Sequence, residues 1–362
     1  MPTQNTTQVN LDSRESIAQF DKDNMLGSLE ALNLQVEHAW DDVKQLNFKL
    51  KRQPKNVVVA GMGGSGLGAD VIKQLFKEEL KVPFDVVNSY TLPNYVDKDS
   101  LVILSSYSGN TEEILAAGED VLKRQAQVMV ITSGGKLYQL AKDNHWPVYK
   151  INPKFNPSGQ PRMAIGYSVF GTLGMCAQAG VINLTDAQVK SVSQAIADVV
   201  AQNTVEIPTE NNPSKSLAFM MLDRRNLYIG AEFLTGALHV SANQANENAK
   251  TFTDYKVIPE MDHHLLEALK YPKNLKSTHF FIFMQSKLYH PRNQKRVLLT
   301  QEIVENYEIE TLRVNLTAKT KLEQVWESIT LLGFAAFYLA MLEGINPSPI
   351  PYVEDFKQKL NQ

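Results

Sequence analysis

The stretch VVVAGMGGSGLGAD, from Val57 to Asp70, decides the fold of the first half of the chain. Four apolar residues predict a buried strand, and a glycine-rich turn follows before a helical pattern begins. Such a turn lets backbone amides approach an anion closely, and the helix behind it adds the positive end of its dipole. The stretch therefore predicts a phosphate site at the carboxyl end of a strand in an α/β sheet.

The spacing of Gly61, Gly63 and Gly66 matches G-x-G-x-x-G, which favours a dinucleotide. A dinucleotide site also needs an acidic residue at the end of the second strand, where it holds the ribose hydroxyls. The second predicted strand, PFDVVNSY, has Asn88 at that place, and its Asp85 lies at the strand's beginning. The sequence therefore lacks the acid that an NAD-dependent dehydrogenase requires, and we expect a smaller phosphate ligand.

The same alternation of strands and helices runs along the rest of the chain. Strand-like segments are NVVVAG, PFDVVNSY, SLVILS, AQVMVIT and PVYKIN in the first half, and NLYIGA, HFFIFMQ and IETLRVNL in the second. Short apolar strands separated by helices are typical of parallel sheets covered on both faces. The predicted class is α/β, with two tandem α/β/α sandwich domains. The predicted organisation is an N-terminal helical segment at 1–50, a first domain at 51–202, a polar linker at 203–218, and a second domain with C-terminal helices at 219–362.

Composition restricts the partners. The 362 residues carry a formal charge of −3, so there is no basic excess of the kind that nucleic-acid binders show. Cys176 is the only cysteine, which excludes an internal disulfide and indicates a reducing, cytoplasmic setting. The first residues, MPTQNTTQVNLDSRES, lack the basic start and apolar stretch of a signal peptide.

One apolar segment, ITLLGFAAFYLAML at 329–342, is too short for a membrane span of about 20 residues. It predicts a buried helix or a subunit contact. The final helix is apolar around much of its circumference, more than one domain face requires, which favours a homodimer interface.

A second polar loop, SSYSGNTEE, follows the third predicted strand. Its hydroxyls and the amides at the start of the next helix would converge at the same carboxyl edge as the glycine turn. Two interpretations remain at this point. Ser106, Ser108 and Thr111 either form part of a phosphate cradle or simply cap the helix.

These motifs together resemble a known family. GMGGSGLGAD, SSYSGNTEE and ITSGG resemble the sugar isomerase (SIS) domain, and the tandem arrangement resembles the bifunctional phosphoglucose/phosphomannose isomerase family from about residue 40 to the C-terminus. The resemblance implies two SIS-type domains. It also implies that the substrate phosphate is held by Gly64, Ser65, Ser106, Ser108 and Thr111.

The segment NENAKTF supplies a candidate base, Glu247. By pattern alone it is either a partly desolvated carboxylate or a surface glutamate paired with Lys250 at i+3. In the resembled family a glutamate is followed sixteen residues later by a histidine, which leads from Glu247 to His263. The resemblance implies that Glu247 moves the proton between C2 and C1 and that His263 opens the sugar ring.

His263 and His264 are adjacent in PEMDHHLLEAL, which leaves open which imidazole acts, because His264 stands where the family would have asparagine. We favour His263. A metal site with Asp262 is a weak alternative, since sequence neighbours rarely converge on one ion. Asp262 is expected to cap the next helix.

Two cations complete the predicted site. Arg162, in SGQPRMAIGYS, either forms a structural ion pair or, as the resemblance implies, faces C1 and C2 and stabilises the enediolate. Lys357, in the terminal NPSPIPYVEDFKQKL, matches a family lysine near the ring oxygen, with Lys359 close by. Ile350 stands where relatives often carry threonine or valine, a position that bears on the use of mannose 6-phosphate.

The resemblance implies an aldose–ketose isomerase that interconverts glucose 6-phosphate, and also mannose 6-phosphate, with fructose 6-phosphate through a cis-enediolate. This chemistry needs no metal and no redox cofactor. The resemblance also implies a homodimer whose active site lies at the subunit boundary, with His263 contributed by the partner chain. The alternatives are a regulatory SIS protein without turnover and an aminosugar synthase, which would need a further glutaminase domain.

Overall fold

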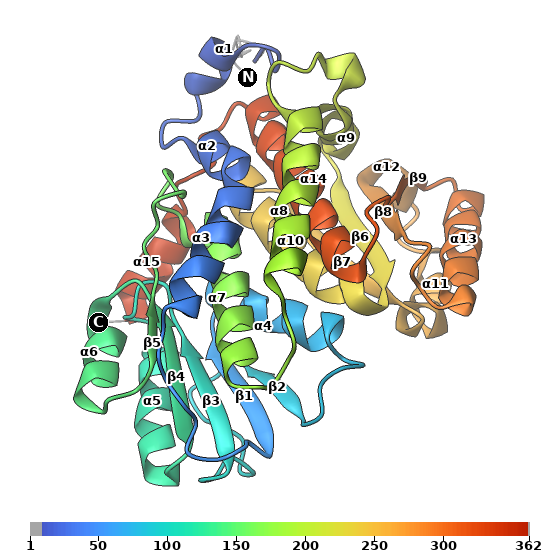
Figure 1. Ribbon diagram of the computed structural model, residues 1–362. Helices are drawn as coiled ribbons and strands as arrows, with labels where there is room; N and C mark the ends of the chain where they lie inside the picture. Colours follow the sequence, from blue (N-terminus) through green and yellow to red (C-terminus); the bar gives the residue numbers. More distant parts are fainter. Residues whose placement is uncertain (1–8, 361–362) are drawn as a thin grey trace.

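Each half of the chain forms a parallel sheet in the computed structural model, which describes residues 9–360 (Figure 1). The strand order is β2-β1-β3-β4-β5 in the first sheet and β7-β6-β8-β9 in the second. In both, the first strand is central and the next two flank it. The predicted α/β class with two parallel-sheet domains is confirmed. The strands are β1 (Asn56–Gly61), β2 (Phe84–Val87), β3 (Ser100–Ser105), β4 (Gln127–Thr132), β5 (Val148–Lys150), β6 (Arg225–Ala231), β7 (Thr253–Ile258), β8 (His279–Gln285) and β9 (Glu310–Asn315).

Strand β1 is buried on both faces, as its continuous apolar run predicts. Val57 and Val59 belong to the large core that both domains share, whereas Val58 and Ala60 face a smaller core under α5 and α6. The helices of the first domain are α4 (Gly64–Leu75), α5 (Glu112–Arg124), α6 (Gly135–Asp143), the short η1 (Pro161–Met163), α7 (Ile165–Gln178) and α8 (Asp186–Asn203).

The N-terminal segment is helical, as expected, and packs onto the first domain. Its helices are α1 (Arg14–Ala18), α2 (Met25–Glu30) and α3 (Leu32–Lys44). Helix α3 lies against α7 and α8, so the segment extends the shared core instead of forming a separate unit (Figure 1).

The segment 203–218, expected to be a polar linker, folds into η2 (Thr209–Asn211) and most of α9 (Pro213–Met221). Several of its polar residues are buried and paired. The ammonium of Lys215, which is fully buried, donates to Asp12 Oδ1 at 2.7 Å and to the carbonyl oxygens of Val205 and Ile207. The segment therefore ties the domains together, and the exact domain boundaries stay a prediction.

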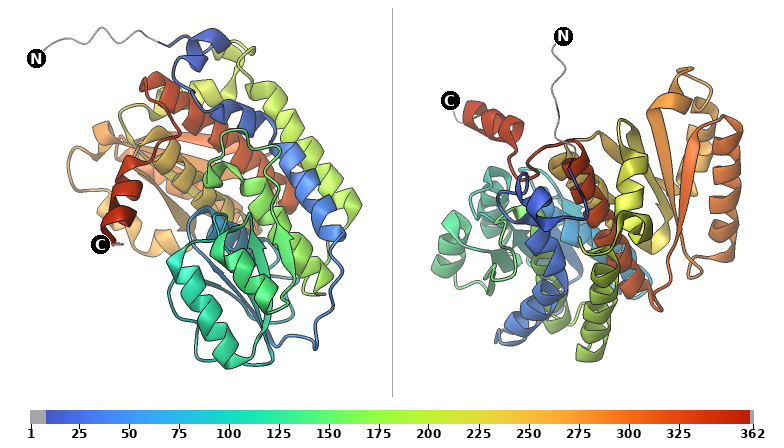
Figure 2. Two further views of the ribbon diagram at one scale, coloured as in Figure 1. Left: turned by 90° about the vertical axis from the view of Figure 1, so that its left-hand side faces the viewer. Right: turned by 90° about the horizontal axis from the view of Figure 1, so that it is seen from above.

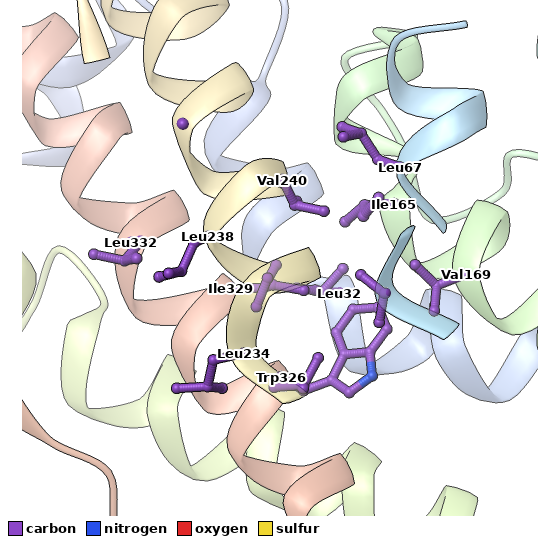
Figure 3. Packing of buried hydrophobic residues seen from close by; sticks show 14 of the residues in the cluster. Leu32, Leu67, Ile165, Val169, Leu234, Leu238, Val240, Trp326, Ile329 and Leu332 are labelled. Carbon is purple, nitrogen blue, oxygen red and sulfur yellow. The ribbon is translucent and has the colours of Figure 1, made fainter. Parts of the chain in front are cut away.

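Helix α14 (Lys321–Leu342) is long and apolar enough to cross a membrane by length and composition, with a mean hydropathy of 1.6, but 83% of that window is buried inside the protein. It lies among α8, α9 and α10, and Figure 3 shows Trp326, Ile329 and Leu332 in this packing. The apolar circumference is therefore covered within one chain. The apolar surface of α14 is thus no evidence for a dimer interface, because helices of both domains surround it.

The second domain contains one strand that the sequence did not predict, β7. It is an edge strand and half-buried over most of its length, so its residues do not form an apolar run. The helices of this domain are η3 (Glu232–Leu234), α10 (Thr235–Gln244), the π-helical turn η4 (Ala245–Ala249), η5 (Glu260–His263), α11 (Leu265–Ala268), α12 (Leu275–Thr278), α13 (Pro291–Asn306) and α15 (Pro351–Leu360). Helix α15 is exposed along its whole length and lies at the periphery (Figure 2).

Candidate active site

The two predicted phosphate loops meet at one edge of the first sheet. Gly61 at the end of β1 pairs in register with Ser105 at the end of β3. The strand order reverses between these strands, which is where α/β sheets bind ligands. The backbone N–H of Tyr107 donates to Ser65 Oγ at 2.9 Å and joins the two loops directly.

The glycine turn is closed by a backbone contact that leaves no room for a side chain. A Cβ on Gly66 would lie 2.7 Å from the carbonyl oxygen of Gly61 and 2.9 Å from Asn88 Nδ2. Asn88 in turn donates to the carbonyl oxygen of Gly61 at 2.5 Å. The residue that replaces the dinucleotide acid thus supports the turn.

The hydroxyls of the second loop do not cap α5. Thr111 is the N-cap residue, but its hydroxyl bonds to Ser106 Oγ at 2.8 Å and makes no cap bond. Ser106 Oγ accepts from Gly109 N at 3.1 Å, and Ser108 Oγ accepts from Asn110 N at 3.2 Å. Helix α4 also begins without a side-chain cap. Two helix N-termini therefore face this edge with amides that no side chain caps, an arrangement suited to an anion.

The serines keep donors available for such an anion. A hydroxyl has one donor and two acceptor lone pairs. Ser65 and Ser108 each use an acceptor position for a backbone N–H, so their hydrogens remain available. The geometry can thus bind a phosphate through amides and hydroxyls without a lysine.

Arg162 lies next to this cradle and is almost completely buried. Its Cα is among the atoms nearest to Gly64, and would lie 3.4 Å from a Cβ added there. Its guanidinium donates from Nε to Asn248 Oδ1 at 2.5 Å. One terminal nitrogen donates to the carbonyl oxygens of Pro347 and Ser348 at 2.9 and 2.8 Å. The arginine therefore links the first domain, the π turn of the second, and the C-terminal turn.

The other terminal nitrogen of Arg162 lies 3.5 Å from Glu247 Oε2 and donates to Gln160 Oε1 at 2.9 Å. Glu247 sits in the π turn η4, a local helix distortion that is frequent at functional sites. Its side chain is 34% exposed, whereas that of Arg162 is 3% exposed. The two candidates from different domains thus form an ion pair at the domain boundary.

The electrostatics of the pair follow from burial. Burial raises the pKa of the Glu247 carboxyl above its usual value, and the charge of Arg162 opposes this rise. Lys250 and Lys357 oppose it to a smaller degree. The carboxylate is therefore more basic than an exposed glutamate, which suits a group that must accept a proton.

Lys250 does not form the predicted alternative pair with the Glu247 carboxylate. Its ammonium donates to the backbone carbonyl of Glu247 and, at 3.0 Å, to that of Pro347. Burial, with the nearby charge of Arg162, lowers the pKa of Lys250 to about 8. The lysine holds the end of the π turn against the C-terminal turn.

Lys357 lies on the exposed helix α15, close enough for its charge to lower the pKa of Glu247. The structure thus brings it toward the candidate base, although the two residues are far apart in sequence.

The structure does not bring His263 to Glu247 within one chain. His263 ends η5 and is exposed, and its side chain has no hydrogen bond or ion pair with the other residues of 9–360. His264 Nε2 instead lies 3.0 Å from Glu260 Oε2. Asp262 does not cap α11 as expected, but contacts Arg296 and Thr300 of α13 at 2.9 and 2.8 Å. Within the described part of the chain no group of three or more His, Cys, Asp or Glu side chains is arranged to hold a metal.

Sequence reasoning missed several groups of this site: Gln160, the side chain of Asn248, and the carbonyls of Pro347 and Ser348. Gln160 and Asn248 are close neighbours of predicted residues in sequence, which is the one signal that pointed to them. The carbonyls have no signal in the sequence, because any residue type supplies a carbonyl.

Comparison with known proteins gives matches over both domains. Residues 50–151 match the SIS domain, and residues 210–360 match the bacterial phospho-glucose isomerase C-terminal SIS domain. A bifunctional phosphoglucose/phosphomannose isomerase of Caldicellulosiruptor bescii is 29% identical over 93% of this chain and 98% of its own length. One of Aquifex aeolicus is also 29% identical, over 85% of this chain and 91% of its own.

Solved structures share the fold. A hypothetical protein from Thermus thermophilus superposes with a TM-score of 0.74 at 18% identity, covering 97% of this chain and 93% of its own. A glucose-6-phosphate isomerase like protein from the same organism gives a TM-score of 0.59 at 18% identity, covering 96% of this chain and 99% of its own.

Proposed function

We propose that this chain, which is similar over most of its length to bifunctional phosphoglucose/phosphomannose isomerases, interconverts glucose 6-phosphate and mannose 6-phosphate with fructose 6-phosphate. One observation carries the proposal for the site. Arg162 packs its backbone beside the glycine turn of the phosphate cradle and pairs its guanidinium with Glu247. This arrangement supports the proposal, because it fixes the separation between the glycine turn and the Glu247 carboxylate, as one sugar phosphate requires.

The reaction assigns a role to each group. The cradle of Gly64, Ser65, Ser106, Ser108 and Thr111 holds the phosphate. Glu247 takes the proton from C2 of the open-chain aldose, and the electron pair of that C–H bond forms the C1–C2 double bond. The same carboxylate then returns the proton to C1, while the hydroxyl proton passes from O2 to O1 and the C2–O bond becomes the ketone. The positive charge of Arg162 stabilises the cis-enediolate between the two steps.

Ring opening precedes this step. We assign it to His263 of the partner subunit in a homodimer, because His263 is exposed and does not reach Glu247 in its own chain. Lys357 assists near the ring oxygen. Dimerisation rests on family resemblance and on this incomplete site, since α14 is already covered inside one chain.

We place the reaction in the cytoplasm. The lone Cys176 is fully buried, and burial raises the pKa of its thiol to about 12, so it stays an unreactive thiol.

A coupled assay with fructose 6-phosphate, scored for both aldose products, tests the proposal. We expect turnover by the wild-type protein and a loss of about 10²- to 10⁴-fold in kcat for Glu247→Gln, because the amide cannot accept the proton. Glu308→Gln, which alters a surface carboxylate paired with Lys276, serves as the matched control and should leave kcat unchanged. A regulatory sugar-phosphate binder would instead bind the ligand and give no product.

The pH dependence gives a second readout of the same residue. Turnover requires ionised Glu247, so kcat/KM should fall as the pH drops through its raised pKa, above the usual value of 4.5. Because the folded protein binds this proton more tightly than the unfolded chain, the free energy of unfolding should decrease as pH rises through the same window. Glu247→Gln should remove this contribution to stability. A stability that rises across the window because of Glu247 would contradict the assignment.

A further inference from the structure

Gln160 is held rigidly beside the ion pair of the candidate site. It directly precedes η1 with an extended backbone, and its carbonyl oxygen accepts from the buried Asn156 Nδ2 at 3.0 Å. Its side chain is half-buried next to Arg162. The backbone position of Gln160 is therefore fixed by a buried amide.

The guanidinium of Arg162 fixes the orientation of the Gln160 side-chain amide. A guanidinium only donates hydrogen bonds, so the oxygen of Gln160 must face Arg162, to which it is bonded at 2.9 Å. The amide nitrogen Nε2 is thereby turned away from Arg162 with two N–H donors. Among residues 9–360 it has no hydrogen-bond partner.

Most donors of Arg162, by contrast, are occupied. Four of its five N–H groups donate to Asn248, Gln160, Pro347 and Ser348. The fifth lies on the nitrogen that faces Glu247 at 3.5 Å and makes only an ion pair with it. Arg162 therefore acts on the substrate mainly through its charge, and a second donor beside Glu247 would add to the stabilisation of a developing oxyanion.

We propose that Gln160 is a catalytic residue that donates a hydrogen bond from Nε2 to the carbonyl oxygen of the open-chain sugar. This inference rests on the proposed isomerase function. When Glu247 removes the C2 proton and the C1–C2 double bond forms, the C1–O π electrons move onto that oxygen, which becomes negatively charged. The N–H of Gln160 stabilises this charge, and no oxidant or further reactant is needed.

Two variants distinguish a hydrogen bond from Gln160 to the substrate from a role that only positions Arg162. Gln160→Glu keeps an acceptor for Arg162 but removes both N–H groups, whereas Gln160→Met removes both functions without adding a charge. We expect each to lower kcat with fructose 6-phosphate by about 10- to 100-fold, with KM changed by less than about threefold. Thermal melting and inhibition by inorganic phosphate, which binds the cradle, should match the wild-type protein.

Three results would overturn the inference. Near wild-type kcat in Gln160→Glu would show that only the acceptor matters. Near wild-type kcat in Gln160→Met alone would show that the effect of glutamate is charge repulsion. A rise in KM without loss of kcat would show a ground-state contact. If the wild-type protein itself gives no product, the proposed function fails, and this is distinguishable from full activity in the Gln160 variants.

Discussion

The two sheets reverse their strand order at equivalent places, between β1 and β3 in the first domain and between β6 and β8 in the second. In the first domain a glycine turn and hydroxyls surround that place, which the proposal assigns to a phosphate. In the second, Glu232 directly follows β6, and its carboxylate accepts from the backbone N–H of His290 at 2.8 Å and from Asn293 Nδ2 at 2.7 Å. In the second domain the carboxylate of Glu232 thus lies at the start of α13, where a ligand anion would otherwise bind.

A serine follows the third strand of each domain, with different surroundings. Ser106 bonds within its own loop, at the edge of the cradle. Ser286 is fully buried and donates to Gln324 Oε1 of α14 at 2.6 Å. Both serines are buried, so they differ in their partners and not in their exposure. The same fold therefore gives two different sites, because binding is decided by the residues placed on the fold.

The second domain contributes the proposed base, Glu247, instead. Its helix α10 packs against α4 of the first domain and continues into the π turn that carries Glu247. In the proposed mechanism the two domains divide the work between phosphate binding and proton transfer, and three variants can test this division.

The largest effect is expected from Gly66→Ala. Its Cβ would lie 2.7 Å from a backbone oxygen, so the turn must move. A shift of about 1 Å in groups that position a substrate costs about 100-fold in kcat/KM. The matched control is Gly230→Ala near the end of β6, where the added Cβ meets the ends of the Leu238 and Tyr289 side chains. The control should change kcat/KM by less than about threefold. Equal losses in both variants would contradict the comparison.

Ser106→Ala should have the next largest effect. Loss of a hydrogen bond to a charged phosphate costs about 1.5–3 kcal/mol, which raises KM for fructose 6-phosphate by about tenfold or more. Ser286→Ala, at the equivalent place, should leave KM unchanged and lower the melting temperature, because Gln324 loses its donor. Steady-state kinetics and thermal melting distinguish the two; a raised KM in Ser286→Ala would place a ligand in the second domain.

The smallest effect is expected from Glu232→Gln. Removing the carboxylate at the start of α13 should lower the free energy of unfolding by about 1 kcal/mol, with KM unchanged. Glu302→Gln, an exposed position within α13, is the control and should have little effect on stability in urea titrations. Stability equal to that of the control would show that the carboxylate does not stabilise this helix.

Much of the fold follows from local patterns. The apolar run at Val57 and the glycine turn predict a buried strand and an anion site because both depend on residues within one turn of chain. The missing acid at Asn88 argues against a dinucleotide for the same reason. Edge strand β7 escaped prediction because half-buried residues do not form a distinct apolar pattern.

The site itself could be predicted only through resemblance. Glu247 looks like a surface glutamate by pattern alone, since neither the π turn nor Arg162, eighty-five positions earlier, is visible from its neighbours. For the apolar helix α14, by contrast, the sequence favoured a subunit contact that the structure does not require. Its hydrophobicity showed that it is buried, but not whether this chain or a second copy covers it.

The sequence by itself determined two parallel α/β domains and a loop chemistry suited to phosphate, because strand burial, turn geometry and helix ends are set by residues close together in the chain. Only the tertiary structure decided that Arg162 pairs with Glu247, that the amide oxygen of Gln160 bonds to Arg162, and that Glu232 lies at the reversal point of the second domain. Those contacts depend on how the domains pack, and packing energy is distributed over many residues that no single motif contains.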